Sequence, residues 1–156
     1  MSDTKHLLIV YHSQSGTTSL MADAVIRGAR SPDIDNVEVR TRTALEACAA
    51  DLLWCDAFIL GTPENFGYMS GVMKYFLDRS FYECVDRIGG RPYALFVRAG
   101  NDGSGAITSL RRILKGLAVK EVQAPVLIAG EFDESRLRDC EELGLTMAAA
   151  LEAGVV

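Results

Sequence analysis

Hydroxyl-bearing residues gather in a short turn near the start of the chain, between an apolar run and a segment with helical spacing. The turn reads His12-Ser13-Gln14-Ser15-Gly16-Thr17-Thr18 and contains no Lys or Arg. The first residues of a helix offer unpaired N–H groups and the positive end of its dipole, and Ser and Thr hydroxyls add donors. The candidate phosphate ligands are therefore Ser13, Gln14, Ser15, Gly16, Thr17 and Thr18.

A cradle of neutral donors suits the single terminal monophosphate of a bound cofactor better than a triphosphate with magnesium, for which a lysine is usual. The alternative is a cluster of N-cap residues that only starts the helix. Two further loops bear on this choice.

Both of these loops follow apolar runs farther along the chain. The second loop of the chain contains Pro63, Glu64, Asn65, Phe66, Gly67, Tyr68 and Met69, and the third contains Arg98, Ala99, Gly100, Asn101, Asp102 and Gly103. The aromatic residues of the second loop offer a flat apolar surface to a ring, and Gly67 lets the backbone approach it. Alternatively, this loop is a β-turn whose Phe66 and Tyr68 cap the core. The third loop is a weak signal by itself, because its glycine spacing is not that of a G-x-G-x-x-G turn.

The elements that must position these loops alternate along the chain. Apolar, β-branched runs predict five strands, and the segments between and after them have helical spacing. The strands are expected at Leu7–Tyr11, Val37–Val39, Ala57–Leu60, Tyr93–Val97 and Val122–Ile128, and the helices at 17–30, 44–53, 70–86, 104–117 and 134–152. This alternation predicts a three-layer α/β sandwich with a parallel sheet, whose shorter second strand lies at an edge. Ligands of such sheets bind beyond the carboxyl ends of the strands, where the three loops lie.

Length and composition limit the classes of function. The chain has 156 residues, of which 49% are hydrophobic and 24% charged, and its net charge is -5. We expect a single domain over residues 1–156. Nucleic-acid binding is not expected, because an acidic chain lacks the clustered Lys and Arg that displace counterions from phosphates. No apolar run approaches the ~20 residues of a bilayer span and no secretory pattern opens the chain, so we expect a cytoplasmic protein without membrane attachment.

The cysteines Cys48, Cys55, Cys84 and Cys140 form no C-x-x-C pair, and the histidines lie far from them in sequence. A metal site is therefore not expected. Because the chain has enough apolar residues to build a core without disulfides, we expect buried, reduced thiols. The stretch from Met147 to Val156 is either the buried face of the last helix or the seam of a homodimer.

The first loop with its surroundings resembles the phosphate-binding signature of flavodoxins. The resemblance rests on the run from Ile9 to Thr18, followed by Ala22 and Val25. It implies a flavodoxin-like fold with a five-stranded parallel sheet in the order 2-1-3-4-5 and FMN at the switch between strands 1 and 3, for which flavodoxin is itself the type example. It also implies that Ser13, Ser15, Thr17 and Thr18 hold the FMN phosphate.

The second loop is more similar to the flavin loop of NAD(P)H-dependent FMN reductases, and of NAD(P)H:quinone oxidoreductases of the tryptophan-repressor-binding-protein type, than to that of electron-carrying flavodoxins. This similarity covers Gly61 to Gly71 and the helix that follows. By resemblance the third loop meets the pyrimidine end of the flavin, and it lacks the aromatic residue that electron carriers commonly stack on the ring. The resemblance implies an FMN oxidoreductase that takes a hydride from NAD(P)H and reduces a quinone, flavin or similar small acceptor. No side chain is expected to act as acid, base or nucleophile, because the flavin performs the chemistry.

A flavodoxin-type one-electron carrier between protein partners is the alternative. Carriers tend to be strongly acidic for docking, and the net charge of -5 is only mildly so, which favours the enzyme. Phospho-acceptor receiver domains share the fold class but need a carboxylate where Gly61 and Thr62 stand. Arg98 either contacts a pyridine-nucleotide phosphate or, as the preferred interpretation, pairs with Asp102.

Overall fold

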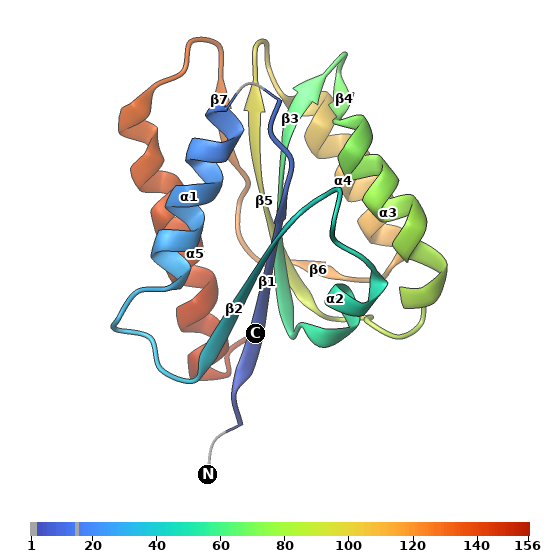
Figure 1. The fold of residues 1–156 in the computed structure, drawn as a ribbon, viewed down its shortest axis with the longest axis vertical. Coiled ribbons are helices and arrows are strands. Elements are labelled where there is room, and N and C mark those ends of the chain that lie inside the picture. The colour runs from blue at the N-terminus through green and yellow to red at the C-terminus, as the bar shows by residue number, and fades with distance from the viewer. Residues whose placement is uncertain (1–2, 15) are drawn as a thin grey trace.

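Strands and helices alternate along the whole chain (Figure 1). The computed structural model describes residues 3–14 and 16–156, so the candidate ligand Ser15 lies outside the described residues. The elements are β1 (Lys5–Tyr11), α1 (Thr17–Ala29), β2 (Val37–Thr43), α2 (Ala49–Trp54), β3 (Ala57–Asn65), β4 (Tyr68–Met69), α3 (Gly71–Cys84), β5 (Pro92–Ala99), α4 (Ser104–Gly116), β6 (Lys120–Glu121), β7 (Val126–Ala129), the 3-10 turn η1 (Glu134–Arg136) and α5 (Leu137–Ala153).

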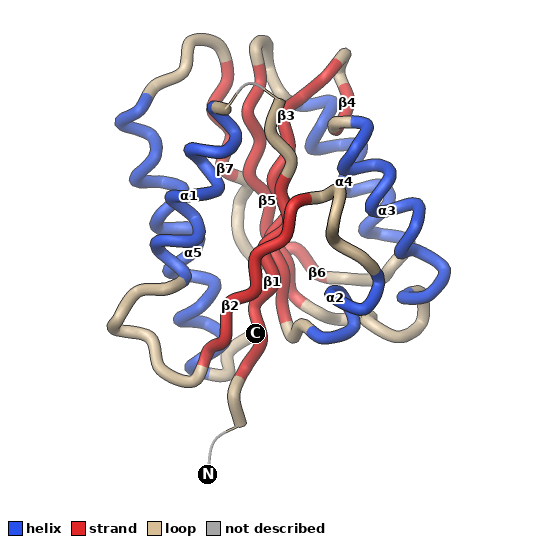
Figure 2. Tube along the Cα trace, in the orientation of Figure 1, coloured by secondary structure: helices blue, strands red, loops and turns tan. Residues whose placement is uncertain are grey.

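A largely parallel sheet forms the centre of the molecule (Figure 2). Its strands lie in the order β2-β1-β3-β5-β6, and β7 also pairs with β5. The flavodoxin-like order and the edge position of the second predicted strand are therefore confirmed. The sheet has seven strands in the described part of the chain, however, where the sequence predicts five. The two-residue β4 runs antiparallel to β3. Instead of one strand over 122–128, two short strands pair with β5: β6 just before this range and β7 from Val126 onward.

The division of the last strand has a backbone cause. Tyr93 of β5 pairs with Glu121, and Phe96 pairs with Val126, so three steps along β5 face five steps along the neighbouring segment. Pro125 is one of the residues between Glu121 and Val126, and it has no N–H to donate to the hydrogen bonds between strands. The extra residues therefore leave the sheet as a bulge between two short strands.

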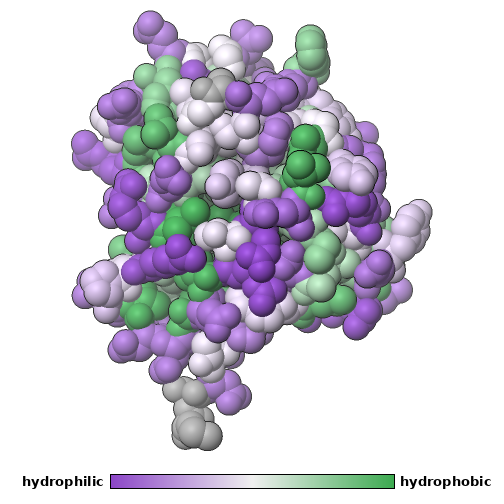
Figure 3. Space-filling view, in the orientation of Figure 1, coloured by the Kyte–Doolittle hydropathy of each residue, from purple (hydrophilic) through white to green (hydrophobic). Residues whose placement is uncertain are grey.

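Helices cover both faces of the sheet, with α1 and α5 on one face and α2, α3 and α4 on the other (Figure 1). Along β5, Ala94 and Phe96 belong to the core beneath α1 and α5, whereas Tyr93 and Leu95 belong to the opposite core. Burial of successive residues on opposite faces explains why the central strands are apolar without alternation. On the surface drawn in Figure 3, hydrophilic and hydrophobic residues are interspersed. None of the described helices has the length and apolar character that crossing a membrane requires.

Two helices begin later than the sequence predicts. Residues 44–46 form a turn instead of helix, and α2 begins at Ala49. At the other end of the chain, Asp133 accepts a hydrogen bond from the N–H of Ser135 and starts a 3-10 turn, so that α5 begins only at Leu137. Both differences arise from capping contacts that apolar periodicity does not register.

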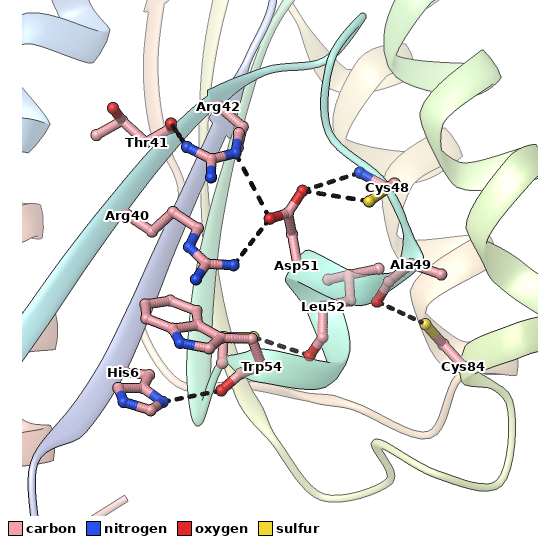
Figure 4. Close-up of polar contacts among 11 residues, drawn as sticks. His6, Arg40, Thr41, Arg42, Cys48, Ala49, Asp51, Leu52, Trp54 and Cys84 are labelled. Carbon is pink, nitrogen blue, oxygen red and sulfur yellow. Dashed lines mark hydrogen bonds and ion pairs between the residues drawn. The ribbon is translucent and has the colours of Figure 1, made fainter.

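The start of α2 carries an exposed thiol (Figure 4). All four cysteines are free, and Cys55, Cys84 and Cys140 are buried as predicted, but the prediction is wrong for Cys48. The Sγ of Cys48 donates to the Asp51 carboxylate at 3.7 Å as part of the helix cap. The same carboxylate pairs with Arg40 at 3.0 Å and Arg42 at 3.5 Å, which holds the edge strand β2 against α2.

We expect one thiol per chain to react rapidly with a disulfide reagent in the folded protein and all four to react after unfolding. Burial raises the pKa of Cys55 to about 12 and that of Cys140 to about 11, and it also raises the pKa of Cys84, so these thiols are shielded and protonated. Thiol titration with and without denaturant measures both counts. Cys48→Ser should abolish the rapid phase and Cys140→Ser should preserve it; a rapid phase that survives in Cys48→Ser contradicts the expectation.

The raised pKa values of the buried Cys55 and Tyr93 lead us to expect that stability falls at alkaline pH. The pKa of Cys55 is raised from 9.0 to about 12, so the folded state keeps a proton that the unfolded state releases. Its stabilising contribution is complete below pH 9.0 and is lost as the pH rises through about 12. Tyr93 acts in the same direction, because burial and then the Glu121 carboxylate raise its pKa from 10.0 to about 12. Urea unfolding at about pH 8 and about pH 10.5 measures the loss, which should be smaller in Cys55→Ala than in Cys48→Ala. Equal losses in both variants would argue against this origin.

Candidate cofactor site

Loops at the carboxyl ends of β1, β3 and β5 surround a pocket of about 240 Å³. These ends lie together at one edge of the sheet (Figure 1). The pocket is lined by Gln14, Thr17, Pro63, Glu64, Asn65, Arg98 and Gly100. The structure thus brings together residues from all three loops that the sequence singled out.

Gly16 shapes the start of α1 beside this pocket. Its φ of 91° lies in the left-handed region, which favours glycine. The N–H of Gly16 donates to the Ser13 hydroxyl oxygen at 3.0 Å, and its carbonyl accepts the N–H of Leu20 at 3.1 Å. The turn therefore leads directly into the helix and places the positive end of the helix dipole at the loop.

Thr18, in the first turn of α1, has a buried hydroxyl with unused hydrogen-bonding capacity. Its side chain is 0% exposed, and its Oγ1 has no hydrogen-bond partner among the described residues. A buried polar group left unsatisfied costs about 1–3 kcal/mol, which an acceptor on a ligand would offset. The Nδ1 of His12 is also buried and has no hydrogen-bond partner among the described residues, and burial lowers the pKa of this histidine below its ordinary value of 6.5. The imidazole is therefore neutral near physiological pH.

β3 and β4 form a tight hairpin whose turn residues are Phe66 and Gly67. Asn65 pairs with Tyr68 across it, and the φ angles of 53° at Phe66 and 71° at Gly67 are both left-handed, as in type I′ turns. For a residue other than glycine such a conformation costs about 1–2 kcal/mol. The Phe66 side chain is 107% exposed and that of Tyr68 is 42% exposed, so this pair does not cap the core. The turn therefore presents the Phe66 ring to solvent, where it is available to contact a ligand.

The hairpin is fixed to the start of α4. The Glu64 carboxylate accepts the N–H of Gly103 at 3.3 Å and that of Ala106 at 3.2 Å. At Gly105 the two segments touch so closely that a Cβ would lie 1.9 Å from the carbonyl oxygen of Gly67. Glu64 therefore caps a helix as well as lining the pocket, a role that its position in the sequence does not reveal.

The loop after β5 is shaped by its own cap. The Asp102 carboxylate accepts the N–H and the hydroxyl of Ser104, each at 3.0 Å, and these bonds lower the pKa of Asp102. Asp102 thus caps α4 and makes no described ion pair with Arg98, so the preferred interpretation of Arg98 is wrong. In the same loop, a Cβ at Gly100 would meet nothing within 4 Å, so there is open space at this residue.

Arg98 gives the pocket a cationic group that the first loop lacks. Its Nη1 donates to the carbonyls of Ala99 and Ile128, the latter at 3.1 Å, and its guanidinium lies 5.4 Å from the Phe132 ring centroid. Its Nε is buried and has no hydrogen-bond partner in the part of the chain that the structure describes. The cradle is therefore not made of neutral donors alone. The sequence places Arg98 and Thr17 in loops of the same site, and both line the pocket; the carbonyls that orient Arg98 could not be foreseen.

Several other predicted site residues do not line this pocket. Met69 and Ala99 are buried and do not line the pocket, and Asn101 is exposed. Gly67 and Tyr68 line a neighbouring pocket of about 320 Å³ on α4, together with Ser109. Ser109 was not predicted, although its hydroxyl oxygen accepts the N–H of Met69 at 3.1 Å and so holds β4 in place. No motif in the sequence marks it.

Residues 12–134, which contain all three loops, match the model of the family described as NADPH-dependent FMN reductase. The chain belongs to this family.

Relatives of this NADPH-dependent FMN reductase family member carry two kinds of name. The chain is 34% identical to a flavodoxin of Aquifex aeolicus over 108 residues, which cover 69% of this chain and 57% of the flavodoxin. It is 33% identical to an NAD(P)H dehydrogenase (quinone) of Acidithiobacillus ferrooxidans over 123 residues, covering 67% of this chain and 62% of that enzyme. The chain therefore spans less than two thirds of the length of both relatives. The structure of a WrbA-like flavodoxin from Agrobacterium tumefaciens has a TM-score of 0.75 at 22% identity, covers 94% of this chain and 96% of that one, and shows the common fold.

Proposed function

We propose that this chain binds FMN in the pocket between the three loops, takes a hydride from NAD(P)H and passes electrons to a quinone, a flavin or a similar small acceptor. The family match and the relative named NAD(P)H dehydrogenase (quinone) support the reaction class. The single observation that carries the proposal is the meeting of the β1, β3 and β5 loops around one pocket, which Thr17 lines from the first turn of α1. The next residue of that turn, Thr18, has a buried hydroxyl without a partner among the described residues.

The residues of the pocket fit FMN. The start of α1, with the hydroxyls of Ser13, Thr17 and Thr18, would hold the phosphate, since helix N-termini suit an anion with several acceptor oxygens. The Thr18 hydroxyl, which has no partner among the described residues, would gain one there. The hairpin at Phe66 and the open space at Gly100 would border the ring. When bound, FMN supplies the hydride-accepting chemistry that no side chain of the pocket offers.

The protein's own contribution is to hold these loops rigidly. Glu64 ties the hairpin to the loop after β5 through the N–H groups of Gly103 and Ala106. Ser109 fixes β4 against α4, and Gly16 sets the turn into α1. A site whose loops are fixed before binding loses less conformational entropy when the ligand arrives.

A titration of the purified protein by quenching of flavin fluorescence tests the proposal. FMN should bind and riboflavin should bind far more weakly, because riboflavin lacks the phosphate; FAD serves as a third ligand. Turnover of NADPH and NADH with a soluble quinone follows. Failure to bind any of the three flavins would refute the proposal.

A one-electron carrier is the second candidate, favoured by the identity to a flavodoxin. The two functions differ in their response to salt, since docking of a protein partner depends on charge whereas reduction by a small donor does so much less. Reduction that needs a partner reductase and falls steeply with ionic strength would favour the carrier.

The four free cysteines suit a reducing compartment, and we assign the protein to the cytoplasm on this ground. Fractionation of the native host with antibody detection would test this assignment.

A further inference from the structure

A groove that the proposed function leaves unused lies between α3 and α4, which pack on the same face of the sheet (Figure 1). It consists of two adjoining pockets of about 320 Å³ each, and Arg112 lines both of them. The hairpin residues Gly67 and Tyr68 border one end, and Tyr82 and Gly116 border the other. We refer to these two pockets together as the α3/α4 groove.

The end of the α3/α4 groove that is remote from the hairpin has an apolar floor. Leu77 is buried there, and Phe81 and Ile113 are partly buried against the core. Tyr82 at the rim is 87% exposed, and its ring meets that of Phe81 edge to face with 5.4 Å between the centroids. An exposed aromatic ring above an apolar floor suits a flat, uncharged heterocycle.

Arg112, where the two pockets adjoin, has a charge that the protein does not compensate. Lys74 and Asp78, the other charged residues of the groove, pair with each other at 2.7 Å. The Arg112 side chain makes no hydrogen bond or ion pair within the described part of the chain. A free guanidinium offers a planar set of donors that matches the oxygens of a phosphate. The groove thus combines a phosphate-binding group with a surface for a planar ring.

The position of Arg112 along α4 also separates it from the carboxylates at the start of that helix. Glu64 accepts two N–H groups there, and Asp102 accepts the N–H and hydroxyl of Ser104. These two carboxylates would repel a phosphate at the start of α4. Arg112 follows Ser104 by eight residues, which places it about 12 Å farther along the helix. A phosphate in the groove is therefore favoured beside Arg112 and not beside the hairpin.

The α3/α4 groove and the cofactor pocket border the same hairpin. Asn65 lines the cofactor pocket and Gly67 lines the groove, and two residues of chain span at most about 7 Å. A reduced pyridine dinucleotide carries its nicotinamide and its adenine at opposite ends. With the nicotinamide at the cofactor pocket, its adenosine half would extend past the hairpin into the groove. NADPH differs from NADH by one phosphate, on the 2′ oxygen of the adenosine ribose.

We propose that the α3/α4 groove binds the adenosine half of the reduced pyridine nucleotide and that Arg112 binds its 2′-phosphate, so that NADPH is preferred to NADH. The inference rests on the proposed function, which supplies the donor. It goes further in naming the form of the donor and the residue that selects it. The purine would lie against Phe81 and Tyr82 at the remote end of the groove.

Binding of nucleotide fragments tests the site without turnover. The probes are adenosine, 2′-AMP and 5′-AMP, titrated by calorimetry into the full-length protein saturated with oxidised FMN. The wild type should bind 2′-AMP about tenfold more tightly than either of the other two, because a hydrogen-bonded ion pair with the guanidinium adds to the contacts of the purine. Arg112→Gln should lose this preference.

Steady-state turnover of the FMN-loaded protein gives a second readout. The ratio of kcat/KM for NADPH to that for NADH should favour NADPH in the wild type and fall about tenfold in Arg112→Gln, through the KM for NADPH and not through kcat. Arg111→Gln is the matched control. Arg111 precedes Arg112 on α4 but pairs with Glu121 at 2.7 and 2.9 Å and does not line the groove. This variant removes the same charge and should change neither the ratio nor the binding of 2′-AMP.

The outcomes separate this inference from the proposed function. A protein that binds no flavin, or that binds FMN but oxidises neither nucleotide, overturns both. FMN binding and turnover with the wild-type preferences retained in Arg112→Gln overturn the inference alone, as does an equal loss of preference in Arg111→Gln. If Arg112→Gln does not fold, the wild type decides, because binding of 5′-AMP or adenosine as tightly as 2′-AMP contradicts a 2′-phosphate site.

Discussion

Thr18→Val is expected to weaken FMN binding by about ten- to a hundredfold while leaving the unliganded protein at least as stable as the wild type. Valine has nearly the same shape as threonine, and the hydroxyl that it replaces is buried without a partner among the described residues. Removing an unsatisfied polar group from the interior does not cost stability, whereas removing a donor to a charged phosphate costs about 1.5–3 kcal/mol of binding. Affinity and stability should therefore change independently.

Thr62→Val is the matched control for this experiment. Thr62 is as fully buried as Thr18, but its hydroxyl donates to the Pro63 carbonyl at 2.8 Å and accepts the N–H of Ser70 at 3.0 Å. This variant should lose about 1–3 kcal/mol of stability in urea unfolding. Riboflavin affinity, which involves no phosphate, should be unchanged in Thr18→Val. Equal destabilisation of both variants, or an unchanged FMN affinity in Thr18→Val, would remove Thr18 from the phosphate site.

The sequence predicts the alternation of strands and helices, and the end of the sheet where the site lies, for a physical reason. Parallel strands joined by helices have all their carboxyl ends at one edge, so the residues that follow β1, β3 and β5 lie at that edge. Apolar runs and helical spacing are local properties that suffice for this much, whereas the strand order comes from the resemblance to flavodoxins.

What the sequence does not predict depends on contacts between distant segments or on short backbone features. Arg98 and Glu64 both stand in the predicted loops, but their contacts do not follow from local pattern: Arg98 is oriented by the carbonyls of Ala99 and Ile128, and Glu64 links the hairpin to α4. The two-residue β4 is too short to show a periodic pattern. The extra residues around Pro125 interrupt the pairing with β5 without interrupting the apolar run. The exposure of Cys48 follows from its position as a helix cap.

The close contact between Gly105 and the hairpin leads to the second large expected effect. Alanine favours a helix over glycine by about 1 kcal/mol, so Gly105→Ala in α4 would stabilise the protein if space allowed. The added Cβ would lie 1.9 Å from the Gly67 carbonyl oxygen, so the backbone of the hairpin or of α4 must move. We expect a net loss of about 1–3 kcal/mol in urea unfolding, as is usual for overpacking. FMN affinity should fall as well, because the displaced hairpin weakens the hydrogen bonds from Gly103 and Ala106 to Glu64.

Gly71→Ala isolates the effect of the contact from that of helix propensity. Gly71 is the first residue of α3, and a Cβ there would meet nothing within 4 Å. This variant should be as stable as the wild type or slightly more stable, and it should bind FMN normally. If Gly105→Ala behaved like Gly71→Ala in both measurements, the hairpin would not depend on its packing against α4. A stability loss in Gly105→Ala with unchanged FMN affinity would instead show that the contact supports the fold but does not position the ligand.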